Sequence, residues 1–455
     1  MSDYQQFIDR KKIMDVPSGF EPEGLPKGLF DFQGDIVKWG CRRGRAAMFE
    51  DCGLGKTPQQ LSWGEQVVRK TNKPVLGLAP MCVTKQTQRE AKKFGLSVNV
   101  ANCQSDIRPG INYTNYQKLH LFNPHEFGGV MLDESSILKS FDGATRNLII
   151  ESFAKTPYKS AYTATPAPND FMELGNHAEF LGVMTRTEML ATFFVHDSGD
   201  TAKWRLKGHA EQDFWKWICS WAVNIRKPSD LGYDDGKFKL PKLNLQEHVV
   251  QSKQKMDGFL FALPASSLQE RRDARRASIN ERLDLAAQMA TGSNEQWVFW
   301  CNLNSESQTL AKMIGAEEIA GDTPEDERDR IAAGFLDGSI RCVVTKPALW
   351  GFGMNLQNCH NTALVGLSDS YESFYQVVRR FWRFGQKKEV NAHIIISDLE
   401  GAVLNNIKRK ESASAQMAAE MVKNMADISS VEIKGLSRQT INYNPQNPMQ
   451  LPSFL

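Results

Sequence analysis

The stretch MFEDCGLGKT, residues Met48–Thr57, decides the fold of this chain. It follows a short apolar run, carries glycine at Gly53 and Gly55, and ends in Gly-Lys-Thr. Glycines at these positions let backbone N–H groups approach phosphate oxygens closely, while Lys56 supplies positive charge and the Thr57 hydroxyl can ligate magnesium. The stretch therefore predicts a phosphate-binding loop between a strand and a helix.

An acidic pair, Asp133-Glu134, offers the carboxylates that a hydrolysing site needs. The apolar run Gly129–Leu132 precedes it, so the pair lies at the carboxyl end of a predicted buried strand, where parallel sheets bind ligands. We expect Asp133 to hold magnesium through water and Glu134 to orient and deprotonate the attacking water. The full phosphate-loop motif has glycine where this chain has Glu50, and a glycine-containing turn with an exposed lysine is the alternative. The acidic pair favours the nucleotide site.

The bulk composition is that of an ordinary globular protein. A length of 455 residues suggests two or three domains of about 150 residues each. The net charge of +2 means that any basic surface must be local. The eight cysteines never fall within four residues of one another, which argues against finger-type zinc sites and favours reduced thiols. No run approaches the length of a membrane span, and we expect a cytoplasmic protein, in the host cytoplasm if it is viral.

Strands alternate with helices along the chain, which predicts parallel sheets. A segment dense in glycine, proline and lysine, Gly232–Lys242, then indicates a hinge, after which a second alternating series begins without a second phosphate loop. We therefore place a domain boundary at 238/239. Before the hinge, strands are predicted at Pro74–Pro80, which ends in a turn, at Gly110–Tyr113 and at Gly129–Leu132, and Lys159–Pro166 is a further strand end. After the hinge, strands are predicted at Gln296–Trp300 and Ile340–Thr345.

A tryptophan-rich segment, predicted to be helical over residues 200–225, has two interpretations. Interleaved lysines and arginines suggest stacking on nucleic-acid bases. However, Phe214, Trp217, Ile218 and Trp221 follow helical spacing, which favours a helix that packs this face into a core.

A late segment combines arginines with apolar residues. Gln376, Arg380 and Arg383 are separated by four and three positions, which predicts that they share one face of a helix. Phe374, Val377 and their apolar neighbours cover the other faces, so we expect a packed helix whose arginines need an anionic partner.

Together these segments resemble helicase superfamily two, and within it the Swi/Snf-like translocases, over nearly the whole span from Phe30 to Ser397. The resemblance is specific because motifs recur in the family's order. In chain order it rests on Phe32-Gln33 as the glutamine motif, Gly53–Thr57 as the first, Asp133-Glu134 as the second, Thr163–Thr165 as the third, Gly351–Leu356 as the fifth and Gln376–Gln386 as the sixth.

The resemblance implies an α/β protein of two tandem RecA-like lobes, residues 1–238 and 239–455, each a parallel sheet flanked by helices. ATP and magnesium would lie in the cleft between them, with DNA running across both. Gln33 would read the adenine, Gly353 would approach the nucleotide, and Arg380 and Arg383 would be the arginine fingers. Arg379 is an additional arginine without that role.

Two departures, at Glu50 and at Ser135-Ser136, and one further likeness accompany the match. Ser135-Ser136 stands where many relatives have Ala-His or Gly-His, which leaves open how hydrolysis is coupled to movement. The compact length and the segment Thr165–Asp170 resemble helicases encoded by phages and prophages.

The leading hypothesis is an ATP-dependent DNA helicase or translocase, with RNA kept as a possible partner and no membrane partner expected. One alternative is a remodelling translocase that tracks along duplex without separating strands. Another is a nucleic-acid-binding subunit in which ATP acts as a switch. Lys56, Glu134 and the two fingers argue against the switch, because a switch needs no activated water.

Overall fold

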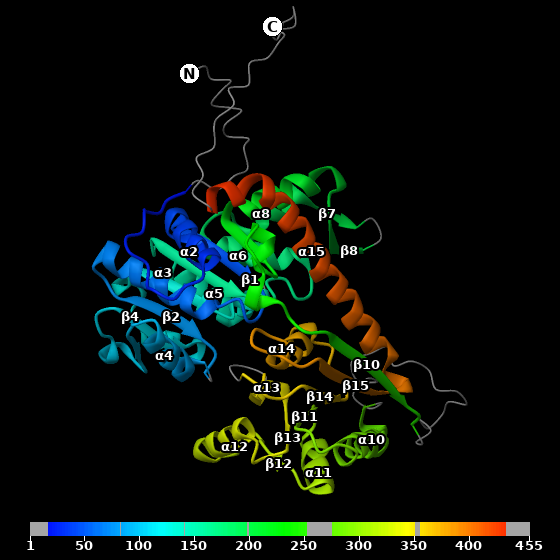
Figure 1. The fold of residues 1–455 in the computed structure, drawn as a ribbon. Helices are drawn as coiled ribbons and strands as arrows, with labels where there is room; N and C mark the ends of the chain where they lie inside the picture. Colours follow the sequence, from blue (N-terminus) through cyan, green and yellow to red (C-terminus); the bar gives the residue numbers. More distant parts are fainter. Residues whose placement is uncertain are drawn as a thin grey trace, which may run out of the picture.

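The computed structural model describes residues 17–81, 83–140, 142–197, 200–252, 275–350 and 355–433. This part of the chain forms two lobes, one above the other in Figure 1, and each lobe is built on its own parallel sheet. The predicted fold class, two parallel sheets flanked by helices, is confirmed. None of the described helices has both the length and the apolar composition that a bilayer span requires.

The first lobe contains a seven-stranded sheet in the order β3-β4-β2-β5-β6-β1-β9, with every neighbouring pair parallel. Its central strands are apolar runs buried along their length, because helices cover both faces of a parallel sheet. The strands are β1 (Arg45–Glu50), β2 (Val75–Ala79), β3 (Val98–Val100), β4 (Ile111–Asn115), β5 (Gly129–Asp133), β6 (Tyr158–Thr163) and β9 (Ala222–Ile225). The α-helices are α2 (Asp31–Arg43), α3 (Lys56–Thr71), α4 (Thr84–Lys93), α5 (Ala144–Ser152), α6 (Leu174–Leu181), α7 (Arg186–Phe193) and α8 (Glu211–Trp221).

The second lobe contains a six-stranded parallel sheet in the order β10-β15-β14-β11-β13-β12. The strands of the first sheet end before residue 226 and those of the second begin after residue 242, on either side of the proposed boundary. The strands are β10 (Leu243–Val250), β11 (Trp297–Cys301), β12 (Glu317–Glu318), β13 (Cys342–Thr345), β14 (Asn361–Val365) and β15 (Val390–Ser397). The α-helices are α10 (Ile279–Thr291), α11 (Asn304–Ile314), α12 (Glu325–Asp337), α13 (Pro347–Trp350), α14 (Tyr371–Phe381) and α15 (Gly401–Ile433).

The tryptophan-rich segment is only partly helical, so the predicted extent of 200–225 was wrong. Strand β8 (Asp200–Leu206) pairs with β7 (Phe194–Asp197) in an antiparallel ribbon, helix α8 follows, and β9 then joins the first sheet. The predicted apolar face of α8 is confirmed, because Trp217 and Trp221 are buried in the core of the first lobe. Trp215, off that face, is buried as well.

The long helix α15 belongs to both lobes. Its first turns place Val403 and Ile407 in the core of the second lobe, whereas Met417 and Met421 lie in the core of the first lobe. Figure 1 shows α15 running from the lower lobe to the upper one, beside α8. This placement explains why α8 is buried beyond its predicted face: the Cys219 thiol lies 3.6 Å from the carbonyl oxygen of Met421.

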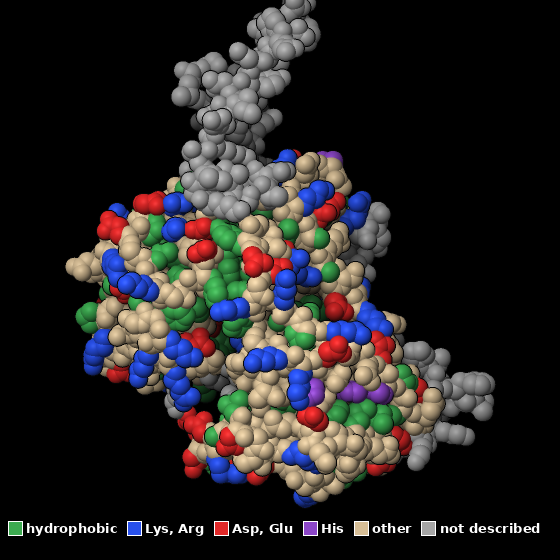
Figure 2. All heavy atoms as spheres, viewed as in Figure 1, with side chains coloured by type: hydrophobic (Ala, Val, Ile, Leu, Met, Phe, Trp, Pro, Cys, Tyr) green, Lys and Arg blue, Asp and Glu red, His purple; other side chains and the backbone are tan. Residues whose placement is uncertain are grey.

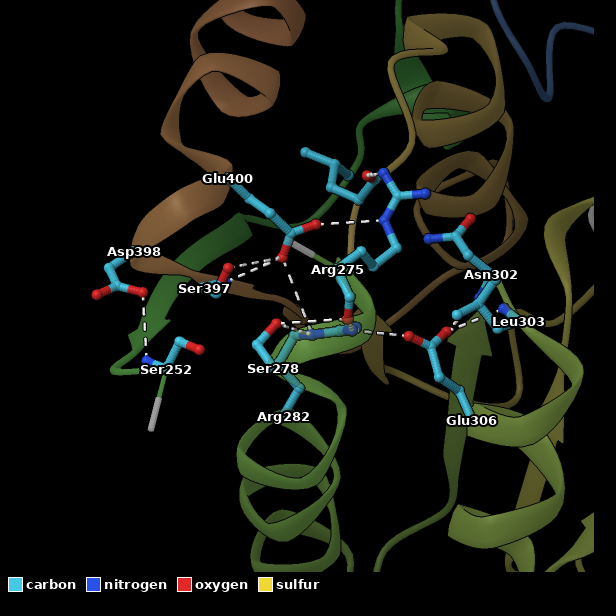
Figure 3. Close-up of polar contacts among 11 residues, drawn as sticks. Ser252, Arg275, Ser278, Arg282, Asn302, Leu303, Glu306, Ser397, Asp398 and Glu400 are labelled. Atoms are coloured by element: carbon cyan, nitrogen blue, oxygen red, sulfur yellow. Dashed lines mark hydrogen bonds and ion pairs between the residues drawn. The ribbon is translucent and has the colours of Figure 1, made fainter. Parts of the chain in front are cut away.

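A buried network of charged residues fixes the base of α15 to the second lobe (Figure 3). The Glu400 carboxylate, just before α15, accepts a hydrogen bond from Arg275 Nε at 3.2 Å and lies 3.9 Å from Arg282 Nε. Arg282 NH2 also pairs with Glu306 at 2.7 Å. The side chains of Arg282, Glu306 and Glu400 are fully buried, so each charge depends on the others for compensation.

Removal of Arg282 should therefore destabilise the protein strongly. Arg282→Met would leave two buried carboxylates with only Arg275 as a cationic partner, and we expect a loss of about 3–5 kcal/mol in the free energy of unfolding. Urea unfolding followed by tryptophan fluorescence measures the free energy of unfolding.

Arg330→Met is the matched control, because Arg330 is 51% exposed and pairs with Glu317 and Glu327 on the surface. Its loss should have little effect on the free energy of unfolding, because solvent screens exposed ion pairs. Equal losses in the two variants would contradict the argument.

Candidate functional site

A cleft of about 390 Å³ opens between the two lobes. It lies within the size range of small-molecule sites. All the predicted site residues that the structure describes line it, although they come from segments far apart in the chain. They are Gln33, Gly53, Gly55, Lys56, Thr57, Asp133, Glu134, Arg380 and Arg383. Gly353 lies outside the described residues, and its neighbours Asn355 and Gln357 line the cleft.

The predicted phosphate-binding loop connects β1 to α3, so its place between a strand and a helix is confirmed. Gly53 and Gly55 have φ values of 92° and 85°, which residues other than glycine rarely adopt. Space also demands glycine, because a Cβ at Gly55 would lie 2.3 Å from Gln33 Nε2 and one at Gly53 would lie 2.8 Å from the backbone nitrogen of Phe384. The loop thus touches the second lobe directly.

Lys56 and Thr57 begin α3, whose N-terminus faces the cleft. The Lys56 ammonium donates to the carbonyl oxygens of Glu50 at 2.8 Å and Asp51 at 3.3 Å, so it is held against the loop. Backbone N–H groups, the helix N-terminus and this ammonium make the loop a positive cradle suited to phosphate.

Glu50, where the full motif has glycine, lies beneath the loop with no exposed surface. One carboxyl oxygen accepts a hydrogen bond from Gln59 Nε2 at 2.7 Å, and the other has no partner among the described residues. Burial raises the pKa of the Glu50 carboxyl to about 7, against the opposing charge of Lys56. The side chain therefore supports the loop from below and does not enter the cleft.

The acidic pair ends β5 at the carboxyl edge of the sheet. The Asp133 carboxylate accepts a hydrogen bond from Gln60 Nε2 at 2.8 Å, and burial raises its pKa. Glu134 has a φ of 52°, and apart from Asn72 it is the only non-glycine residue with positive φ in the described chain. Such backbone strain is typical of functional positions. Burial raises the pKa of Glu134 to about 7, Lys56 opposes this, and Asp133 adds to it.

The two predicted finger arginines come from the second lobe, but not from one helical face. Helix α14 ends at Phe381, so the prediction that Arg383 lies on its face was wrong. Arg383 lies in the following turn, where Gly385 has a φ of 93°. Both arginines nevertheless line the cleft. Burial, and then the charge of Arg380, lower the pKa of Arg383. The positive charges of Arg380 and Arg383 repel each other, so an anion bound beside both would be favourable.

Arg379 has a role that the sequence did not reveal. It forms an ion pair with Asp51 of the phosphate-binding loop, with Nε 2.9 Å from Oδ1, and its guanidinium lies 4.6 Å from the ring centre of Trp382. Only 3% of the residue is exposed, and burial lowers its pKa to about 9. A third arginine on a packed helix could have indicated a buried partner, but nothing in the sequence pointed to Asp51.

Three phenylalanines form an aromatic wall of the cleft that sequence reasoning also missed. Phe30 precedes α2, Phe238 lies in the connection between the lobes, and Phe384 follows α14. The ring centres of Phe30 and Phe238 are 4.9 Å apart, and those of Phe238 and Phe384 are 4.8 Å apart. No local sequence pattern could find the wall, because its members come from three distant segments.

The Gln33 amide joins this wall to the phosphate-binding loop. Its oxygen accepts a hydrogen bond from the Phe30 backbone N–H at 3.0 Å, and its nitrogen donates to the Leu54 carbonyl oxygen at 2.7 Å. One amide hydrogen remains for a further acceptor.

The threonines of the third segment lie at the carboxyl end of β6, the strand beside β5 and β1. Thr163 Oγ1 accepts a hydrogen bond from the Thr165 backbone N–H at 3.1 Å, and both residues are buried. Neither lines the cleft, so the structure places this segment next to the site rather than in it.

The chemistry of the cleft suits a phosphorylated nucleotide with a hard divalent cation. Lys56, Arg380 and Arg383 supply positive charge for phosphates, and the Thr57 hydroxyl and the Asp133 carboxylate are the oxygen ligands that magnesium prefers. The aromatic wall supplies a flat apolar surface beside them. The residues present therefore fit both groups.

One comparison with known proteins, a match to a family model, agrees with part of the resemblance. The family model described as helicase conserved C-terminal domain matches residues 280–385, which lie in the second lobe and include Arg380 and Arg383. No curated protein matches the sequence. A solved structure, the Sulfolobus solfataricus SWI2/SNF2 ATPase core in complex with dsDNA, is 17% identical with a TM-score of 0.43, over 92% of this chain and 99% of that chain.

The raised pKa of Glu50 predicts a stability that falls as pH rises. Its carboxyl has a pKa of about 7 when folded and an ordinary value of 4.5, so its stabilising contribution is complete below pH 4.5 and is lost through pH 7. Glu50→Gln keeps an uncharged side chain at all pH values. Between pH 5 and pH 8 we expect the free energy of unfolding of the wild type to fall relative to that of Glu50→Gln, by up to about 1.4 kcal/mol for each unit of pKa shift. The melting temperature of the wild type should fall relative to that of the variant over the same range.

Differential scanning fluorimetry across this pH range measures the effect. Glu151→Gln is the control, because Glu151 is exposed on α5 and should leave the pH dependence of the wild type unchanged. Parallel curves for the wild type and Glu50→Gln would contradict an ionisable Glu50 in this pH range.

Proposed function

We propose that this protein is an ATP-dependent nucleic-acid translocase or helicase. One observation carries the proposal: the phosphate-binding loop and acidic pair of one lobe face Arg380 and Arg383 of the other across a single cleft. The match of residues 280–385 to the helicase conserved C-terminal domain supports the same class.

In this proposal the first lobe binds the nucleotide. The backbone around Gly53 and Gly55, the N-terminus of α3 and the Lys56 ammonium hold the phosphates. Thr57 and Asp133 would hold magnesium, which neutralises phosphate charge when bound. The purine would pack against the wall of Phe30, Phe238 and Phe384, with the remaining Gln33 amide hydrogen free for a base nitrogen.

Glu134 is proposed as the general base, and Arg380 and Arg383 as the groups that stabilise charge in the transition state. A base is most effective when its pKa is near the working pH, and the pKa of Glu134 is about 7. The arginines meet the charge that develops on the transferred phosphoryl group. Because base and arginines lie on different lobes, turnover depends on how closely the lobes approach.

DNA is the proposed partner, with RNA as the alternative. The net charge is only +2, so contacts to a phosphate backbone must come from local groups of basic side chains. Figure 2 shows lysine and arginine side chains on both sides of the junction between the lobes. A partner that touches both lobes would couple its own binding to closure of the cleft. A phage or prophage origin stays a prediction of the sequence resemblance.

Strand separation distinguishes a helicase from a translocase that tracks along duplex. A strand-displacement assay on a tailed duplex would detect the first activity. Displacement of a third strand from a triplex would detect the second without requiring the duplex to open.

The central test is ATP hydrolysis with and without nucleic acid. We expect hydrolysis to be slow alone and to rise several-fold or more with DNA.

Glu134→Gln should keep ATP and DNA binding but stall turnover, since the amide preserves shape and cannot accept the proton. Lys56→Ala should instead weaken ATP binding through loss of the phosphate contact. A coupled ATPase assay and a fluorescent ATP analogue measure the two effects. Equal rates with and without every nucleic acid tested would reject the motor.

The arginines should affect turnover more than binding. Arg380→Ala and Arg383→Ala should each reduce DNA-stimulated hydrolysis at least about a hundredfold, because arginine fingers contribute about 10³ to 10⁵ in rate. ATP affinity should change less than roughly tenfold, since the interaction strengthens in the transition state. Arg379→Ala is no neutral control, because Arg379 is buried against Asp51. The control is Arg330→Ala, because Arg330 is exposed on α12. Turnover unchanged in both finger variants would remove these residues from the reaction.

A further inference from the structure

Helix α14 presents a row of polar side chains to the first lobe. Glu372, Gln376 and Arg379 are separated by four and three positions, so they lie on one face of the helix. All three are buried, with 7%, 1% and 3% of their surface exposed. Buried polar groups need partners, and those of this row come from the opposite lobe.

The acidic end of the row contacts the short helix η4 (Ser135–Lys139), which directly follows the acidic pair. Glu372 accepts hydrogen bonds from the Ser136 hydroxyl and from the Lys139 ammonium. Ser136 is one of the two serines at which this chain departs from the helicase motif, and the structure gives it a partner in the second lobe.

The middle of the row reaches the acidic pair, and its basic end reaches the phosphate-binding loop. Gln376 Nε2 lies 3.4 Å from Glu134 Oε2. Arg379 pairs with Asp51, which also accepts a hydrogen bond from the hydroxyl of Tyr375. One helix thus touches two separate segments of the first lobe that line or border the cleft: the acidic pair with η4, and the phosphate-binding loop.

The charges along this contact are ordered. At one end, the negative Glu372 of α14 contacts the positive Lys139 of the first lobe. At the other end, the positive Arg379 of α14 contacts the negative Asp51 of the first lobe. A shifted or reversed seating would bring Arg379 toward Lys139 or Glu372 toward Asp51, and like charges oppose such arrangements. The pattern therefore selects one register of the lobes.

We propose that Glu372 and Arg379 are positioning residues that seat α14 on the first lobe and thereby aim Arg380 into the cleft. Arg380 follows Arg379 in the chain, and its NH2 group is 3.1 Å from Gln376 Oε1, whose amide nitrogen faces Glu134. The catalytic consequence rests on the proposed function. The seating itself rests only on the two ion pairs.

The pair of Lys139 and Glu372 allows a charge-swap test. Lys139→Glu and Glu372→Lys each place like charges together, whereas the double variant restores an opposite pair in reverse order. We expect each single variant to reduce DNA-stimulated kcat at least about tenfold, with the Kd for a fluorescent ATP analogue changed less than about threefold. The double variant should recover kcat to within about threefold of the wild type.

Hydrogen–deuterium exchange of the wild type and variants provides a readout independent of catalysis. Each single variant should increase exchange in residues 135–139, and the double variant should restore protection. If the wild type hydrolyses no ATP but exchange follows this pattern, the register stands and the proposed function fails. If the wild type is active and the single variants match it in both kcat and exchange, or if the double variant multiplies the two defects, the register is rejected.

A second pair covers the case in which a charge reversal prevents folding. Asp51→Asn and Arg379→Gln are milder neutral changes at the other end of the row. Each should lower kcat with little change in ATP affinity, and the double variant should be less impaired than the product of the two single effects. Strict multiplicativity in properly folded variants would overturn the proposal at this end as well.

Discussion

The organisation of the cleft depends on charges that are buried where the two lobes meet. A buried guanidinium or carboxylate is costly unless an opposite charge or hydrogen bonds satisfy it. In this protein several of those partners lie on the other lobe, so neither lobe alone satisfies its own polar groups at the contact. The ion pair of Arg379 and Asp51 and the contact of Glu372 with Lys139 are therefore constraints on how the lobes fit together as well as local interactions.

This arrangement places the groups of the proposed site on the facing surfaces of two different lobes. The acidic pair and the phosphate-binding loop are fixed by the first sheet, whereas Arg380 and Arg383 are fixed by α14 and its following turn. Small relative movements of the two lobes then change the distances across the cleft. The pKa of Glu134, raised to about 7 chiefly by burial, also responds to charges of the second lobe, because Arg380 lowers it and Glu372 raises it.

The sequence allowed the parts of the site with local chemistry to be predicted. A loop with two glycines and a lysine, and a carboxylate pair after an apolar strand, are recognisable because their spacing follows from the geometry of the backbone. The end of α14 at Phe381 could not be predicted, because the glycine that marks the turn, Gly385, lies beyond Arg383 in the sequence. The aromatic wall and the partner of Arg379 arise from contacts between distant segments. The role of Gly353 stays a prediction.

The shared helix α15 bears on how the chain is made. The first sheet is complete at Ile225, but Met417, Met421 and Met425, which belong to the core of that lobe, come much later. Synthesis of the roughly 190 intervening residues takes on the order of 10 to 40 seconds at typical rates. During this interval the apolar surface of α8 and β9 that α15 finally covers remains bare on the nascent chain, where it is open to chaperones and to aggregation. The lobe that leaves the ribosome first is the one whose core closes last.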